Sequence, residues 1–145
     1  MANEIDLPTH ADPNRLAKRQ VRLAGRLDLH KLTRLTPLLL ASAESCCQVV
    51  LAFSLNERGV SLIQGRVTGC LQLVCQRCLG AFAWDFNLPI NLAVIKSETE
   101  EAKIPSGFEA LFSLEEAVNL NEAVEDELLL NVPNYPVHEN NCKND

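Results

Sequence analysis

Residues 47–94, CQVVLAFSLNERGVSLIQGRVTGCLQLVCQRCLGAFAWDFNLPINLAV, contain three successive segments in which apolar and polar side chains alternate. The apolar positions of the first segment are Cys47, Val49, Leu51, Phe53 and Leu55. Alternation with a period of two is the pattern of a β-strand that buries one face. The turn-forming sequence Asn-Glu-Arg-Gly follows at residues 56–59. The first two segments are therefore predicted to pair as a hairpin.

The second and third segments extend this hairpin. The apolar positions of the return strand are Ile63, Val67, Leu71 and Leu73. In the third segment, residues 81–94, aromatic and aliphatic residues alternate with small and polar ones. The whole stretch predicts a three-stranded antiparallel meander with one face in the core.

Further elements are predicted on both sides of the meander. The dipeptide Asp12-Pro13 is typical of a helix start, which predicts a short helix up to Lys18. Alternation over residues 21–29 predicts an additional, half-buried strand. A capping asparagine and a four-residue apolar repeat predict a helix over residues 120–131. The expected fold is α+β: an antiparallel sheet of three long strands and an N-terminal strand, packed with two or three helices.

A chain of 145 residues has the size of one domain. We therefore expect a single domain over residues 1–145. Residues 96–107, KSETEEAKIPSG, are charged and contain proline and glycine, which is typical of a flexible loop. Pro133 and Pro136 oppose continuation of the helix and predict an extended tail over residues 133–145.

Two short-spaced pairs of metal-type ligands lie far apart in the sequence. Cys75 and Cys78 belong to Cys-Gln-Arg-Cys, between the second and third strands, and His138 and Cys142 lie in the predicted tail. Zn²⁺ takes four nitrogen or sulfur ligands in a tetrahedron, and two such pairs are the usual way to supply them. The sequence therefore predicts one structural zinc ion bound by these four residues. We also expect Gly80 to take the positive φ that closes a cysteine turn.

Two other interpretations of the cysteine pair remain open. In thiol-disulfide enzymes, the first cysteine lies at a helix N-terminus, whose dipole lowers the pKa of the thiol. Here a predicted strand follows, so we expect that Cys75 and Cys78 do not cycle as a redox couple. The other alternative is that the cysteines are ordinary buried thiols and that His138 lies on the surface of a loose tail.

Charge is distributed unevenly along a chain whose net charge is −6. Residues 1–80 contain ten basic and six acidic residues, whereas residues 81–145 contain three and thirteen. Five of the cations fall within a segment that has no acid, which makes them a candidate phosphate-binding stripe. They are Arg15, Lys18, Arg19, Arg22 and Arg26. The alternative is a solvated surface, since no aromatic residue lies among them to stack on bases.

The acidic residues Glu125, Asp126 and Glu127 of the predicted C-terminal helix raise the question of catalysis. Paired carboxylates can serve acid-base chemistry, but a helix with one apolar stripe must also present polar residues to water. The sequence contains no glycine-rich phosphate loop, no Gly-x-Ser-x-Gly and no His-Glu-x-x-His. We therefore interpret the three acids as solvent-facing and name no catalytic residue. We expect neither enzymatic activity nor a small-molecule substrate.

The chain contains six cysteines. The N-terminal residues 1–15 lack the apolar core of a signal peptide, and no run approaches the ~20 apolar residues of a membrane helix. These features predict a cytoplasmic protein with reduced thiols and no membrane partner.

Two blocks of sequence resemble the YceD family, the large ribosomal RNA subunit accumulation proteins. They are GRVTGCLQLVCQRCLGAF at residues 65–82 and EAVEDELLLNVPNYPVHENNCK at residues 122–143. The resemblance also includes the N-terminal segment DPNRLAKR. In many relatives a cysteine stands at the position of His138, which implies that this position carries a ligand. Relatives commonly continue with a basic tail, which implies that part of the activity lies beyond Asp145 if that tail contacts ribosomal partners.

The resemblance implies a bacterial, cytoplasmic, non-enzymatic factor that supports synthesis, processing or accumulation of the large-subunit (23S) ribosomal RNA. The implied partner is this RNA or a ribosomal protein of the large subunit. The alternatives are a thiol-redox or RNA-processing enzyme, and a protein-binding module whose acidic helix, Glu122 to Glu127, binds a basic ribosomal protein.

Overall fold

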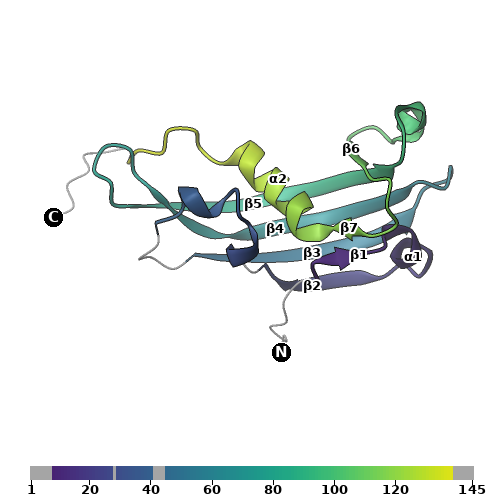
Figure 1. Ribbon diagram of the computed structural model, residues 1–145, viewed down its shortest axis with the longest axis horizontal. Helices are drawn as coiled ribbons and strands as arrows, with labels where there is room; N and C mark the ends of the chain where they lie inside the picture. The colour runs from purple at the N-terminus through teal and green to yellow at the C-terminus, as the bar shows by residue number, and fades with distance from the viewer. Residues whose placement is uncertain (1–7, 28, 41–44, 139–145) are drawn as a thin grey trace.

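Five strands form the main sheet of the computed structural model, which describes residues 8–27, 29–40 and 45–138 (Figure 1). Strands β2 to β5 are antiparallel to their neighbours, and β6 pairs with β5 in parallel. The sheet is therefore mixed. Its strands, in spatial order, are β2 (Arg22–Arg26), β3 (Cys46–Leu55), β4 (Ser61–Val74), β5 (Ala81–Ile95) and β6 (Glu109–Phe112).

The predicted meander is confirmed as β3, β4 and β5. Between β3 and β4, the Asn56 side-chain oxygen accepts hydrogen bonds from the amides of Arg58 and Val60, at 2.9 and 2.8 Å. Gly59 takes the left-handed conformation that this turn needs, with φ +83°. The predicted apolar face is buried, apart from Leu55 at the end of β3, which is 39% exposed. We call this buried side the inner face of the sheet and the opposite side the outer face.

The prediction of a purely antiparallel sheet was wrong at its far edge. After β5, the chain passes through the 3₁₀ helix η3 (Glu98–Lys103), within the segment predicted as a flexible loop. It then pairs β6 with the end of β5, from Leu92 opposite Glu109 to Ile95 opposite Phe112. A parallel pair needs a crossover rather than a tight hairpin, and the connection through η3 supplies it.

A second, two-stranded sheet was not predicted. It pairs β1 (His10–Ala11) with β7 (Val118–Asn119) in antiparallel fashion. Each strand has two residues, too few to form an alternating pattern in the sequence.

Both predicted α-helices are confirmed. Helix α1 (Pro13–Lys18) begins after Asp12, whose carboxylate accepts hydrogen bonds from two amides of the first turn. Helix α2 (Leu120–Asn131) begins after Asn119, whose side-chain oxygen accepts from the amide of Glu122 at 3.0 Å. The predicted strand over residues 21–29 ends at Arg26. Two short 3₁₀ helices follow it, η1 (Leu29–Lys31) and η2 (Thr36–Leu38).

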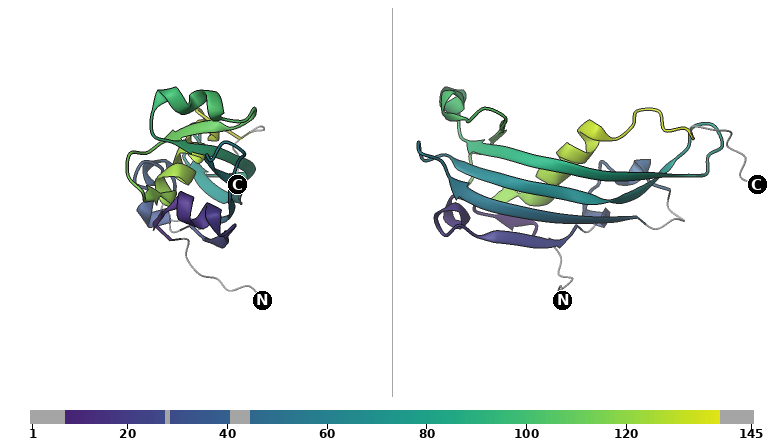
Figure 2. Two further views of the ribbon diagram at one scale, coloured as in Figure 1. Left: turned by 90° about the vertical axis from the view of Figure 1, so that its right-hand side faces the viewer. Right: turned by 180° about the vertical axis from the view of Figure 1, so that it is seen from behind.

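Helix α2 crosses the inner face of the sheet, and the core lies between them (Figure 1). Leu120, Val124 and Leu128 of the helix are buried against Val49 and Phe53 of the strands and their neighbours. Seen from behind, β2 to β5 lie in front of α2, and no helix crosses their outer face (Figure 2). None of the helices in the described ranges is long and apolar enough to span a membrane.

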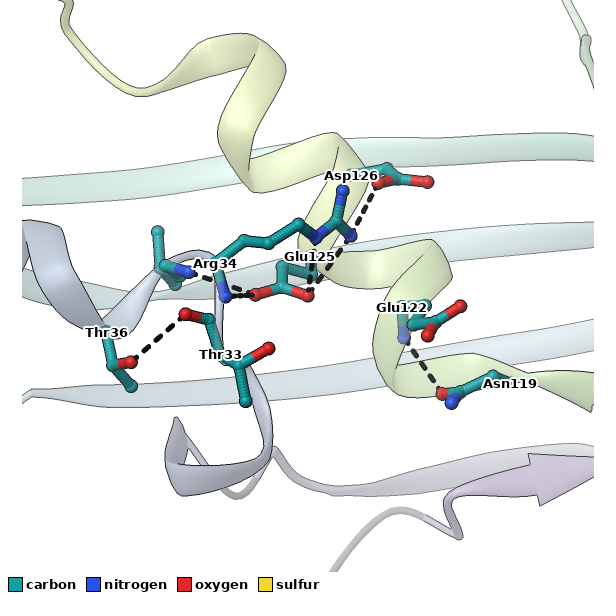
Figure 3. Close-up of polar contacts among 8 residues, drawn as sticks. Thr33, Arg34, Thr36, Asn119, Glu122, Glu125 and Asp126 are labelled. Carbon is teal, nitrogen blue, oxygen red and sulfur yellow. Dashed lines mark hydrogen bonds and ion pairs between the residues drawn. The ribbon is translucent and has the colours of Figure 1, made fainter.

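The expectation that all three acids of α2 face the solvent was wrong for Glu125, which is 2% exposed. Its carboxylate accepts hydrogen bonds from the amides of Arg34 and Leu35 at 2.8 and 3.0 Å. The Arg34 guanidinium also donates to it, and it reaches Asp126 at 2.7 Å (Figure 3). A buried carboxylate is tolerated because charged and polar donors satisfy it. These donors come from the β2–β3 connection, so no local pattern in α2 predicts them.

Candidate metal centre

The Cys-Gln-Arg-Cys segment forms the turn between β4 and β5. The amide of Cys75 donates to the carbonyl of Gly80 at 2.9 Å, and the amide of Leu79 donates to the carbonyl of Cys75 at 2.8 Å. Strand β5 begins at Ala81, so within this turn no helix starts at either cysteine. The expected positive φ falls on Leu79, at 62°, rather than on Gly80. The 75–79 hydrogen bond closes the turn one residue before the glycine, and this places the left-handed residue there.

The start of the C-terminal tail lies against this turn. The amide of Gln76 donates to the carbonyl of Pro136 at 2.8 Å. The guanidinium of Arg77 donates to the carbonyl of His138 at 2.6 Å. The two residues between the cysteines therefore hold the tail through its backbone. Sequence analysis missed these contacts, and the charged residue inside the Cys-x-x-Cys motif was the available signal.

Three of the four predicted ligands converge. The sulfur atoms of Cys75 and Cys78 and a ring nitrogen of His138 all lie within 4.8 Å of one another. The distance from Cys78 Sγ to His138 Nδ1 is 3.7 Å. Zinc bonds of about 2.3 Å to sulfur and about 2.0 Å to nitrogen, at the tetrahedral angle, separate these two atoms by roughly 3.6 Å. The three side chains therefore fit a tetrahedral zinc ion with little movement.

The histidine ring is oriented for this role. His138 Nε2 lies 3.0 Å from the carbonyl oxygen of Ala81. A carbonyl oxygen only accepts hydrogen bonds, so Nε2 carries the proton and the lone pair lies on Nδ1, beside Cys78. Metal-binding histidines usually donate their other ring nitrogen in this way, which fixes both tautomer and orientation. The ring also packs near Phe82, with centroids 5.8 Å apart.

The site has the burial expected of a structural centre. Cys75 is fully buried, and Cys78 and His138 are half-buried. The fourth predicted ligand, Cys142, lies outside the described residues. The proximity of His138 to two cysteines disagrees with the alternative of a surface histidine in a loose tail.

The other described cysteines lie on the strands and not in this cluster. Cys47 belongs to the core, and burial raises the pKa of its thiol to about 12. Cys46 and Cys70 are cross-strand partners on the outer face. Burial, together with a hydrogen bond to Asp85, raises the pKa of Cys70. These thiols are therefore less readily ionised than a free cysteine.

The structure divides the predicted basic stripe between two surfaces. Arg15, Lys18 and Arg19 are exposed on α1, a helix on the inner side of the sheet whose Ala17 is in the core. Arg22 and Arg26 are exposed on the outer face of β2. Gln20, with φ 53°, lies in the sharp turn between them. The five cations do not form one continuous stripe.

Comparison with known proteins agrees with these features. The model of a protein family described as large ribosomal RNA subunit accumulation protein YceD matches residues 63–145, a range that includes both pairs of candidate ligands. A protein of that description from Haemophilus influenzae is 26% identical over 136 residues, which cover 93% of this chain and 78% of the relative. No solved structure matches the chain. The chain belongs to the YceD family.

Proposed function

We propose that this protein is a non-enzymatic, cytoplasmic factor in biogenesis of the large ribosomal subunit. It supports synthesis, processing or accumulation of large-subunit ribosomal RNA by contacting that RNA or a ribosomal protein. The family match over residues 63–145 carries this proposal, together with the name of the Haemophilus influenzae relative.

The second part of the proposal is one zinc ion, bound by Cys75, Cys78, His138 and Cys142. The support is the convergence of three ligand atoms within 4.8 Å and the fixed tautomer of His138. The ion would join the C-terminal tail to the β4–β5 turn. A structural zinc site stabilises a fold directly, because the metal binds only the folded arrangement.

The non-enzymatic assignment rests on the same ligand set. Four protein ligands complete a tetrahedral zinc and leave no coordination position for a substrate, unlike catalytic zinc sites. A thiol-redox activity has less support, since β5 rather than a helix follows the cysteines. An acidic surface for a basic ribosomal protein is available on α2, where Glu122 and Asp126 are exposed.

The test of this function uses a bacterium that lacks its own YceD-family protein. Expression of this chain is expected to restore the ratio of large- to small-subunit ribosomal RNA, and crosslinking is expected to recover it with precursors of the large subunit. Cys75→Ser is expected to restore the ratio poorly, whereas Cys70→Ser, away from the cluster, restores it fully. An unchanged ratio on expression of the wild-type chain contradicts the proposal.

A further inference from the structure

The outer face of β2 to β5 is an open surface built from aligned rows of side chains (Figure 2). Cross-strand pairing places residues of neighbouring strands side by side on this face. One row is Arg22, Ala52, Gln64 and Asn91; the next contains Ala24, Val50, Arg66 and Pro89; the third is Arg26, Gln48, Thr68 and Asn87.

The open area has a defined boundary. At one end, Leu62 and Ala93 of the outer face are buried beneath Ile104 and Phe108, which form a small second core. The β4–β5 turn with the candidate metal ligands lies at the other end. The rows of polar side chains between these ends therefore form a continuous platform.

This platform is basic in a protein whose net charge is −6. Its charged residues on the described strands are Arg22, Arg26, Arg66 and a single acid, Asp85. Arg66 donates to the neutral side-chain oxygen of Asn87 at 2.6 Å, so its charge is not compensated by that contact. The exposed acids of α2 lie on the other side of the sheet. The uneven charge of the sequence thus becomes a difference between two faces.

The chemistry of the platform suits phosphate and ribose groups. Guanidinium groups bind phosphate oxygens, and the neighbouring amide side chains can both donate to and accept from a ribose hydroxyl. All aromatic residues of β5, Phe82, Trp84 and Phe86, lie in its other register, away from the outer face. Unpaired bases need aromatic partners for stacking, whereas base-paired RNA presents only its backbone and groove edges.

The arginines are also spaced for separate contacts. Four residues along β2 separate Arg22 from Arg26 by about 13 Å, and β4 lies roughly 10 Å from β2 across the sheet. Each guanidinium can therefore contact a different phosphate.

We propose that the outer face of β2 to β5, centred on Arg22, Arg26 and Arg66, binds the sugar-phosphate backbone of base-paired RNA. This inference rests on the proposed function and names the surface through which the protein contacts ribosomal RNA.

The test measures binding of the full chain to an RNA hairpin and to an unstructured single strand of equal length, over a range of salt concentrations. The first variant carries Arg22→Gln, Arg26→Gln and Arg66→Gln. A matched control, Arg58→Gln with Lys96→Gln and Lys103→Gln, removes the same charge from exposed positions away from the platform. A third variant, Arg15→Gln with Lys18→Gln and Arg19→Gln, tests α1. Circular dichroism verifies folding of each.

The outer-face variant is expected to lose at least tenfold in affinity for the hairpin, and its dependence of log K on log salt is expected to fall by about 3, one for each phosphate contact. The control is expected to retain hairpin affinity within threefold. Equal losses in both variants, loss only in the α1 variant, or equal affinity for the single strand each overturn the proposal.

Wild-type protein that binds no hairpin also overturns it, including the case in which only a ribosomal protein is crosslinked. The ratio of ribosomal RNAs in complemented cells then judges the proposed function separately. A restored ratio without RNA binding rejects the platform alone.

Discussion

The carboxylate of Glu125 accepts hydrogen bonds from both the main-chain amide and the guanidinium of Arg34, at 2.8 Å and at 3.1–3.2 Å (Figure 3). The two residues lie 91 positions apart in the sequence. Their contact fixes α2 against the connection between β2 and β3. Because Glu125 is buried and Arg34 is half-exposed, the carboxylate depends on these donors more than the guanidinium depends on the carboxylate.

We predict that Glu125→Gln lowers the free energy of unfolding by about 2–4 kcal/mol, because the amide nitrogen of glutamine faces donors and leaves one of them unsatisfied. Asp126→Asn is the control: this exposed partner of Arg34 is expected to contribute less than about 1 kcal/mol. Urea unfolding measures both variants. Equal effects of the two substitutions contradict the structural role of the buried carboxylate.

Elemental analysis of purified protein is expected to find one zinc ion per chain. Cys75→Ser is expected to remove the metal and lower the temperature of unfolding, since structural zinc sites contribute on the order of 10 kcal/mol of apparent binding energy. Cys142→Ser tests the fourth ligand in the same assay. Cys70→Ser, a thiol outside the cluster, should keep full zinc content. Metal-free wild-type protein with reduced thiols at neutral pH rules out the site.

Cys75 and Cys78 are expected not to cycle as a redox couple. No helix begins at the turn between β4 and β5, so no helix dipole stabilises a thiolate there. An insulin-reduction assay is expected to show no activity above that of Cys75→Ser. Thiolate detected at pH 6 in metal-free protein would revive the redox interpretation.

Stability is expected to fall as the pH rises from about 4.5 to about 7. Burial, followed by a hydrogen bond with Glu109, raises the pKa of Glu127 from 4.5 to about 7. A raised carboxyl pKa means that the folded state binds the proton more tightly than the unfolded state, so deprotonation destabilises the fold. Glu127 is half-exposed, and solvent screening reduces this effect to about 1 kcal/mol.

Glu127→Gln is therefore expected to stabilise the protein by about 1 kcal/mol at pH 8 and to leave stability unchanged at pH 4. Urea titrations at both pH values measure the difference. Glu116→Gln, an exposed acid on the preceding loop, serves as the control and is expected to show no pH-dependent gain. A gain of equal size at pH 4 would exclude the shared proton as its cause.

Local patterns predicted the parts of this fold that local physics determines. The Asn56 turn and the alternation on either side of it specified β3 and β4, and Asp12 and Asn119 specified the starts of both α-helices. The spacing of Cys75 and Cys78 likewise indicated a ligand pair, because two thiolates in one turn already lie close together.

The sequence by itself therefore determined the strands, the helix starts and three residues of the metal cluster. Only the tertiary structure decided that β6 runs parallel to β5, that Glu125 is buried on Arg34, and that Arg22 and Arg66 share an open face. The physical reason is distance along the chain. Turns, caps and alternation depend on neighbouring residues, whereas these relationships depend on which distant segments pack together.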